Sequence, residues 1–142
     1  MRILQNLLFI GFLCLIAACE RDTRVKMRTE LPPQFELSGS GKLAMLRVHG
    51  QKVRNLDGEL SFINWEIQPK DGLYEGTRVE DLGIVTYGKV PDGYKKIYPE
   101  KGETLPEFIE GQTYHVFFDT TGANGAHVYF QVKQGKLIEV KN

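Results

Sequence analysis

Tyr114-His115-Val116-Phe117-Phe118 is the first of two alternating stretches near the C-terminus, and the second is Ala126-His127-Val128-Tyr129-Phe130-Gln131-Val132. Successive side chains of a β-strand point to opposite faces, so alternation over this length predicts half-buried strands. The connection at residues 120–125 is short enough for the two strands to pair as an antiparallel hairpin. We expect this hairpin to bury one face, formed by Tyr114, Val116, Phe118, Ala126, Val128, Phe130 and Val132.

More strands are predicted on both sides of this hairpin. No stretch beyond Pro33 keeps apolar residues at helical spacing for three turns, and frequent glycines and prolines mark turns. The pattern predicts an all-β fold class, a single antiparallel β-sandwich of about seven strands formed by residues 34–142. Its other predicted strands are Phe35–Leu37, Leu43–Val48, Leu60–Ile67, Leu82–Tyr87, Tyr94–Tyr98 and Leu137–Val140.

Three local details follow from pattern and turn chemistry. In the strand Leu60–Ile67, the inward residues are expected to be Ile63, Trp65 and Ile67, with Asn64 and Glu66 on the other face. Gly39-Ser40-Gly41-Lys42 is interpreted as a turn, because it lacks the remaining residues and the following helix of a phosphate-binding loop. The last turn is predicted to be the three-residue loop Lys133-Gln134-Gly135, which would pair Phe130 with Ile138 and Val128 with Val140.

The predicted sandwich resembles fibronectin type III and, more broadly, immunoglobulin-like domains. The resemblance is carried by Trp65 on an early strand and by Phe108-Ile109-Glu110-Gly111-Gln112-Thr113-Tyr114. It implies that Trp65 is a core residue and that Tyr114 packs at the corner between the sheets and bonds back to the backbone. Glu110 departs from the family pattern, which usually has proline there, and the 62–82 region is longer than the family's.

The first eighteen residues have the composition of a secretory signal peptide. One positive charge at Arg2 precedes an apolar run that is shorter than a bilayer span and ends just before Glu20-Arg21-Asp22. The run closes with Ile16-Ala17-Ala18-Cys19, which resembles the lipobox of bacterial lipoproteins. The resemblance implies removal of residues 1–18 and acylation of Cys19, which would hold the protein on membrane lipid. Because Glu20 replaces the aspartate that retains enteric lipoproteins on the inner membrane, we expect the outer membrane, facing the periplasm.

Residues 19–33 are predicted to be the lipidated N-terminus and a flexible tether. Charged residues dominate this segment, and Pro32-Pro33 closes it. Four of them are basic (Arg21, Arg24, Lys26 and Arg28), and either a solvated linker or contact with anionic headgroups would suit this composition.

Few classes of chemistry find support in the mature sequence. Cys14 leaves with the signal peptide and Cys19 is blocked by lipid, so neither a disulfide nor a thiolate site is expected. The near-neutral charge shows no basic stripe for nucleic acid. The three histidines lack zinc-site spacing, and no nucleophile elbow occurs. We therefore expect no catalytic residues, no cofactor and no metal, and do not expect an enzyme.

One surface constellation is a candidate for partner contact. The alternation that buries Tyr114 and Val128 turns His115, Phe117, His127 and Tyr129 outward, with Phe117 and Tyr129 expected to be near each other and the histidines diagonal to them. Aromatic residues on a solvent face are typical of protein interfaces. A cross-strand pair that only stabilises its sheet, or rings covered by residues 94–108, would give the same pattern.

Two functions from different classes remain open at this point. The preferred one is a binding or assembly module of the cell envelope with an envelope protein as partner. The alternative is a carbohydrate-binding or hydrolytic accessory that uses Trp65, Tyr94 or Tyr98. An exposed Trp65 in a groove would favour the alternative, and a buried Trp65 the binding module.

Overall fold

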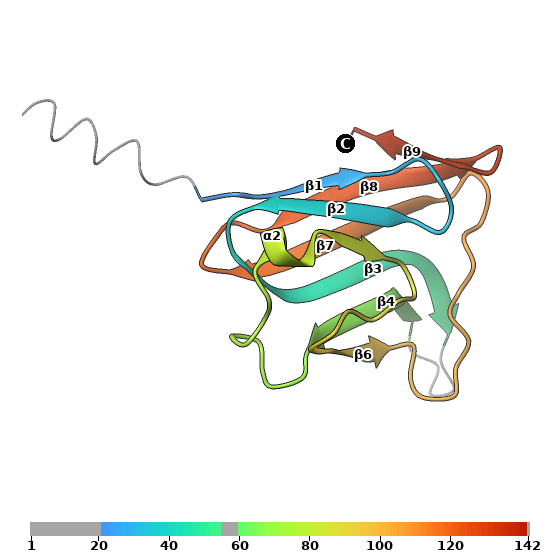
Figure 1. The fold of residues 1–142 in the computed structure, drawn as a ribbon. Coiled ribbons are helices and arrows are strands. Elements are labelled where there is room, and N and C mark those ends of the chain that lie inside the picture. The colour runs from blue at the N-terminus through green and yellow to red at the C-terminus, as the bar shows by residue number, and fades with distance from the viewer. Residues whose placement is uncertain (1–20, 55–59, 142) are drawn as a thin grey trace, which may run out of the picture.

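The computed structural model describes residues 21–54 and 60–141, so the predicted signal peptide, the lipobox and Cys19 lie outside the described residues. The described chain is an all-β sandwich of two antiparallel sheets, and β1 and β2 cross in front of the larger sheet in Figure 1. The smaller sheet has the order β1-β2-β5, with β1 Thr23–Met27, β2 Gln34–Gly39 and β5 Ile84–Thr86.

The larger sheet has the order β6-β4-β3-β7-β8-β9. Its strands are β3 Lys42–Arg54, β4 Leu60–Pro69, β6 Tyr94–Tyr98, β7 Thr113–Thr121, β8 Ala126–Lys133 and β9 Lys136–Val140. The predicted hairpin is confirmed as β7 and β8, and of its predicted inward residues only Ala126 is not fully buried. The core between the sheets is closed by fully buried side chains, among them Phe35, Leu46, Trp65, Tyr114 and Phe130.

The predicted strand Leu82–Tyr87 is only partly correct. Val79–Leu82 forms the short helix α2, and β5 starts at Ile84. Gly83 separates the two with a φ of 61°, a conformation that glycine adopts without steric cost. One buried residue, Val79, holds the helix to the core.

The flexible tether predicted for residues 19–33 is wrong where the chain is described. Thr23–Met27 is β1, paired along its whole length with β2, so the sandwich begins well before residue 34. Thr23 is buried, and its hydroxyl donates to the Ser40 carbonyl at 2.7 Å, while Val25 and Met27 pack against the core. The inward residues of β1 alternate with the exposed cations Arg24 and Lys26. Because these charges dominate the composition, the alternation is hard to recognise in the sequence.

A β-bulge changes the expected faces of β4. The register passes from Val48↔Trp65 to His49↔Ile63, so Asn64 is the inserted residue. Trp65 and Ile67 are buried as predicted, but Ile63 is turned to the outer face beside His49, and Asn64 is buried and hydrogen-bonded to Tyr87. A single inserted residue reverses the orientation of everything beyond it, which alternation alone cannot anticipate.

The three-residue loop predicted between the last two strands is also wrong. Lys133 pairs with Lys136, Val132 with Leu137 and Phe130 with Glu139, which leaves the two-residue turn Gln134-Gly135. Both turn residues have positive φ, 52° and 71°, as a type I′ turn requires. From the sequence alone this register is unfavourable, because it pairs the inward Phe130 with Glu139, but β9 is an edge strand where Leu137 is buried and Glu139 remains exposed to solvent.

The bond expected between Tyr114 and the backbone upstream of it is present. The Ile109 backbone N–H donates to the Tyr114 hydroxyl at 2.7 Å, a bond back to the chain five residues upstream, as the resemblance implied. Trp65 is fully buried and meets the ring of Tyr87 edge-on at 5.4 Å. In the smaller sheet β2 lies between β1 and β5, and in the larger sheet β3 lies between β4 and β7.

Candidate functional site

The candidate site lies on the face of the larger sheet that is turned away from the smaller sheet. Two rows of paired residues cross this face. One row runs Glu66, Arg47, Phe117 and His127, and the other runs Ile63, His49, His115, Tyr129 and Val140. We call the central part, defined as His49, His115, Phe117, His127 and Tyr129, the histidine face.

The four residues predicted from the sequence are brought together, although their arrangement differs from the prediction. The direct cross-strand pairs are His115 with Tyr129 and Phe117 with His127, so it is Phe117 and Tyr129 that are diagonal. The His115 ring is stacked on Tyr129, with centroids 4.2 Å apart and planes 9° from parallel. His127 meets His115 at 5.4 Å and Tyr129 at 5.7 Å, so the rings form one continuous surface.

His49 completes this surface and was missed by the sequence argument. Its ring is stacked 6.1 Å from that of His115, so all three histidines of the chain lie on one face. The alternation in β3 could have predicted that His49 points outward, because its neighbour Val48 is a core residue. Nothing in the sequence indicates that β3 lies next to β7, because the two strands are separated by two intervening strands of the larger sheet and one of the smaller.

A buried ion pair borders the histidine face. Arg47 Nε donates to Glu66 Oε2 at 2.7 Å, and Gln68 Nε2 donates to Glu66 Oε1 at 2.8 Å. Only 4% of the Glu66 side chain is exposed, compared with 31% for Arg47. Both carboxylate oxygens of Glu66 therefore accept hydrogen bonds. The ion pair forms a polar border beside Phe117, which pairs with Arg47 across the sheet.

Burial and neighbouring charges favour neutral rings at the centre of the face. Burial lowers the pKa of His115, and the nearby His127 and His49 lower it further. The pKa of His49 is lowered by burial and by the Arg47 guanidinium, against which Glu66 acts in the opposite direction. Among the described residues the buried Nε2 of His115 has no hydrogen-bond partner, so nothing there stabilises an added proton.

Residues 94–108 do not cover the rings of the histidine face. Residues 94–108 turn toward the core: Tyr94 is buried, and Phe108 contacts the rings of Tyr87, Tyr114 and Phe130. His127 is exposed, and His115, Phe117 and Tyr129 are half-buried, with His115, His127 and Tyr129 in mutual ring contact. A hollow of about 410 Å³ flanks the face and is lined in part by His127, Tyr129 and Val140.

The aromatic residues on which the carbohydrate or hydrolytic alternative depends are largely inaccessible. Trp65 and Tyr94 are 0% and 2% exposed, and the Tyr94 hydroxyl donates to the Leu43 carbonyl at 2.8 Å. Tyr98 is half-buried at the edge of the sheet, opposite Glu66. Within residues 21–54 and 60–141, no group of three or more His, Cys, Asp and Glu residues is placed to hold a metal ion.

The fold and site define an all-β sandwich with one aromatic, histidine-rich sheet face. In the described part of the chain no helix has the length and apolar character to span a bilayer. No protein-family model, no curated protein and no solved structure matches this chain.

Proposed function

We propose that this protein is a lipoprotein of the bacterial cell envelope that binds a partner protein through its histidine face. The lipobox Ile16-Ala17-Ala18-Cys19 supports the anchor. One observation carries the binding role. On the outer face of the larger sheet, the rings of five residues form a continuous surface: His49, His115, Phe117, His127 and Tyr129.

Two properties of this surface suit protein binding. Aromatic rings already stacked on one another lose little side-chain entropy when a partner covers them. The lowered pKa values of His49 and His115 favour uncharged rings at neutral pH, so a partner need not desolvate two cations. A partner with an apolar centre and a polar rim would complement the rings and the Arg47–Glu66 pair.

The double variant Phe117→Ser with Tyr129→Ser tests the proposal. Because both side chains lie on the outer face and neither belongs to the buried core, we expect the thermal midpoint to change little while crosslinking to an envelope partner is lost. The measurement is photo-crosslinking from a probe at position 127 in intact cells, followed by mass spectrometry of the adduct.

The matched control is Leu73→Ser with Ile109→Ser. These two apolar residues are 49% and 50% exposed and lie outside the histidine face, so crosslinking from position 127 should persist. If the control loses the adduct as fully as the test variant, or if the test variant unfolds, the face has a structural role and the proposal is wrong.

A further inference from the structure

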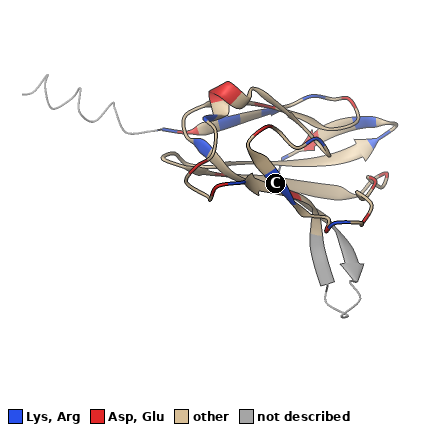
Figure 2. Cartoon of the chain, turned by 60° about the horizontal axis from the view of Figure 1, so that its bottom comes forward, with Lys and Arg blue, Asp and Glu red and all other residues tan. Residues whose placement is uncertain are grey.

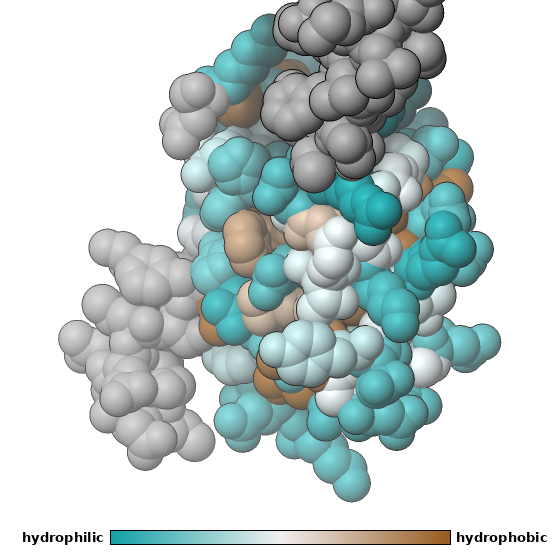
Figure 3. Space-filling model, turned by 90° about the vertical axis from the view of Figure 1, so that its left-hand side faces the viewer, coloured by the Kyte–Doolittle hydropathy of each residue, from teal (hydrophilic) through white to brown (hydrophobic). Residues whose placement is uncertain are grey.

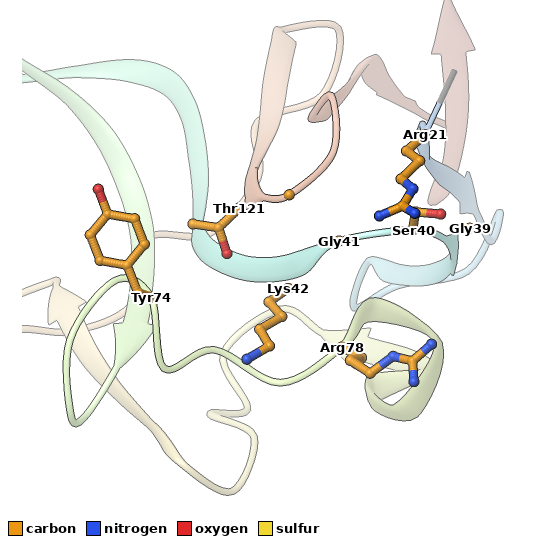
Figure 4. Close-up of a pocket in the computed structure, with 9 residues that line it drawn as sticks. Arg21, Gly39, Ser40, Gly41, Lys42, Tyr74, Arg78 and Thr121 are labelled. Atoms are coloured by element: carbon orange, nitrogen blue, oxygen red, sulfur yellow. The ribbon is translucent and has the colours of Figure 1, made fainter. Parts of the chain in front are cut away.

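A basic pocket lies at the end of the sandwich where the described chain begins. It has a volume of about 630 Å³, within the range of small-molecule sites. Three cations line it from segments far apart in sequence: Arg21 before β1, Lys42 at the start of β3 and Arg78 before α2 (Figure 4). Ser40, Tyr74 and Thr121 also line it, and no acidic residue does within residues 21–54 and 60–141.

The backbone pairs two of these residues directly, and their charged ends extend in different directions (Figure 4). Lys42 and Arg78 are paired in an antiparallel bridge, and the Val79 N–H donates to the Gly41 carbonyl at 3.0 Å. Gly41 has a φ of 100°, and a β-carbon there would lie 2.9 Å from that of Ala123. The turn that positions Lys42 therefore requires glycine, and the wall of the pocket at this point is bare backbone.

Two of the three positive charges have no ion-pair partner in the part of the chain that the structure describes. In the described ranges the ion pairs are Arg47–Glu66 and Arg78–Glu80, so neither Arg21 nor Lys42 takes part in one. The Asp22 carboxylate next to Arg21 instead accepts a hydrogen bond from the Asn124 side chain. Figure 2 shows basic residues at this end of the molecule, with the acidic residues of α2 beside them.

The pocket is close to the predicted membrane anchor. Arg21 is two residues after Cys19, and two residues of chain span at most about 7 Å. Figure 3 shows hydrophilic residues at this end around a central patch of intermediate and hydrophobic residues, a mixed surface that can meet the headgroup region. Along the adjoining β1, Arg24 and Lys26 are exposed on one side, as is Arg28 just after the strand, and Lys26 is opposed on β2 by Glu36.

We infer that this pocket binds the phosphate of an anionic phospholipid headgroup in the leaflet that holds the lipid anchor. Arg21 and Lys42 would supply the charge-assisted hydrogen bonds, with Arg78 and the hydroxyl groups around them. Such a contact would fix the orientation of the sandwich on the membrane. The choice of a lipid as the ligand rests on the proposed lipoprotein anchor. The capacity to bind an anion is argued separately, from the residues that line the pocket.

The test uses the full-length protein in a nonionic detergent and follows the backbone amide resonances of Gly39, Ser40 and Gly41. Dihexanoyl phosphatidylglycerol should shift them saturably, and dihexanoyl phosphatidylcholine, which enters the same micelles, should not. Lys42→Gln and Arg21→Gln should each weaken the apparent affinity about tenfold, since each removes one charged donor. Lys101→Gln, an exposed lysine in a distant turn, should leave it unchanged.

Three results would overturn the inference: no saturable shift, equal shifts with both lipids, or an affinity that Lys42→Gln and Arg21→Gln do not alter. Sodium phosphate binding as tightly as phosphatidylglycerol would assign the pocket to a soluble phosphate and also refute the lipid. The mass of the N-terminal peptide is measured on the same preparation. An unmodified Cys19 would refute the anchor without changing the amide readout, so the two failures are distinguishable.

Discussion

At the scale of the residue, Trp65 bears on the carbohydrate-binding alternative. Trp65 is completely buried and in edge contact with Tyr87, so its indole belongs to the packing between the sheets. Burial of an aromatic residue of this size contributes strongly to a domain that has no disulfide among its described residues. An exposed sugar-stacking role for this residue is excluded by its position.

Trp65→Ala should therefore lower the free energy of unfolding by about 3–5 kcal/mol, because it leaves a large cavity in a closed core. Urea unfolding followed by circular dichroism measures the change. In the wild-type protein the indole emission should be blue-shifted and resistant to acrylamide. A loss below about 1 kcal/mol, or red-shifted and easily quenched emission, would show that the residue is not part of the core.

Protonation of His115 is expected to lower the stability of the folded protein. Its pKa is lowered from the ordinary value of 6.5 by burial and by the adjacent histidines, so the folded protein binds fewer protons here than the unfolded chain just below pH 6.5. The free energy of unfolding should then fall as the pH drops from 6.5 through the folded-state pKa. His115→Gln should flatten this part of the stability curve.

Imidazole proton resonances followed by NMR titration provide the direct measurement. His115 should titrate with a midpoint below 6.5, and partner crosslinking at the histidine face should decline over the same interval. A midpoint at or above 6.5 would contradict the argument. Glu66 is held by Arg47, so its carboxylate is not free to stabilise the protonated ring.

At the scale of the element, edge strands behave differently from central ones. The central strands β3, β4 and β7 bury their inner faces, so alternation predicts their existence well, apart from the bulge in β4. β1 and β9 lie at sheet edges, where one side of the strand is open and charged residues are tolerated. For this reason the sequence predicts a tether in place of β1 and the wrong register for β9.

The turn between β8 and β9 gives a test of that register. Gln134 has a φ of 52°, and asparagine adopts this conformation more readily than glutamine, so Gln134→Asn should stabilise the protein by about 0.5 kcal/mol. Gln134→Val should destabilise it, because a β-branched residue resists positive φ. The thermal midpoints of the two variants measure the difference. The three-residue loop with a bulge needs positive φ only at Gly135, so equal stabilities would support that loop instead.

At the scale of the whole molecule, our proposals give the sandwich two binding surfaces. The histidine face lies on β3, β7 and β8, and the basic pocket lies where β1 begins, next to the predicted anchor. A domain fixed to the membrane through the pocket would hold the histidine face at a constant orientation toward a partner. The anchor is the condition for this arrangement.

Cys19→Ser should abolish lipid attachment and processing before residue 19, since only a cysteine thiol can form the thioether that the lipobox resemblance implies. Membrane fractionation and mass spectrometry of the N-terminal peptide measure both effects. Ala18→Ser keeps a small residue before the cysteine and serves as the control. A mature wild-type N-terminus at any residue other than Cys19, or an unmodified one, would show that the protein is not a lipoprotein.

By itself the sequence determined the all-β class, most of the strands and the burial of Trp65, which depend on local periodicity and on turn residues that can be read along the chain. The bond from the backbone to Tyr114 was implied only by the family resemblance. Only the tertiary structure decided that β1 joins the sandwich, that Asn64 is an inserted residue, and that His49 stacks on His115. The basic pocket belongs with these features, because it unites Arg21, Lys42 and Arg78. The physical reason is that strand neighbours and register are set by pairing between distant segments, and a shift of one residue exchanges the two faces.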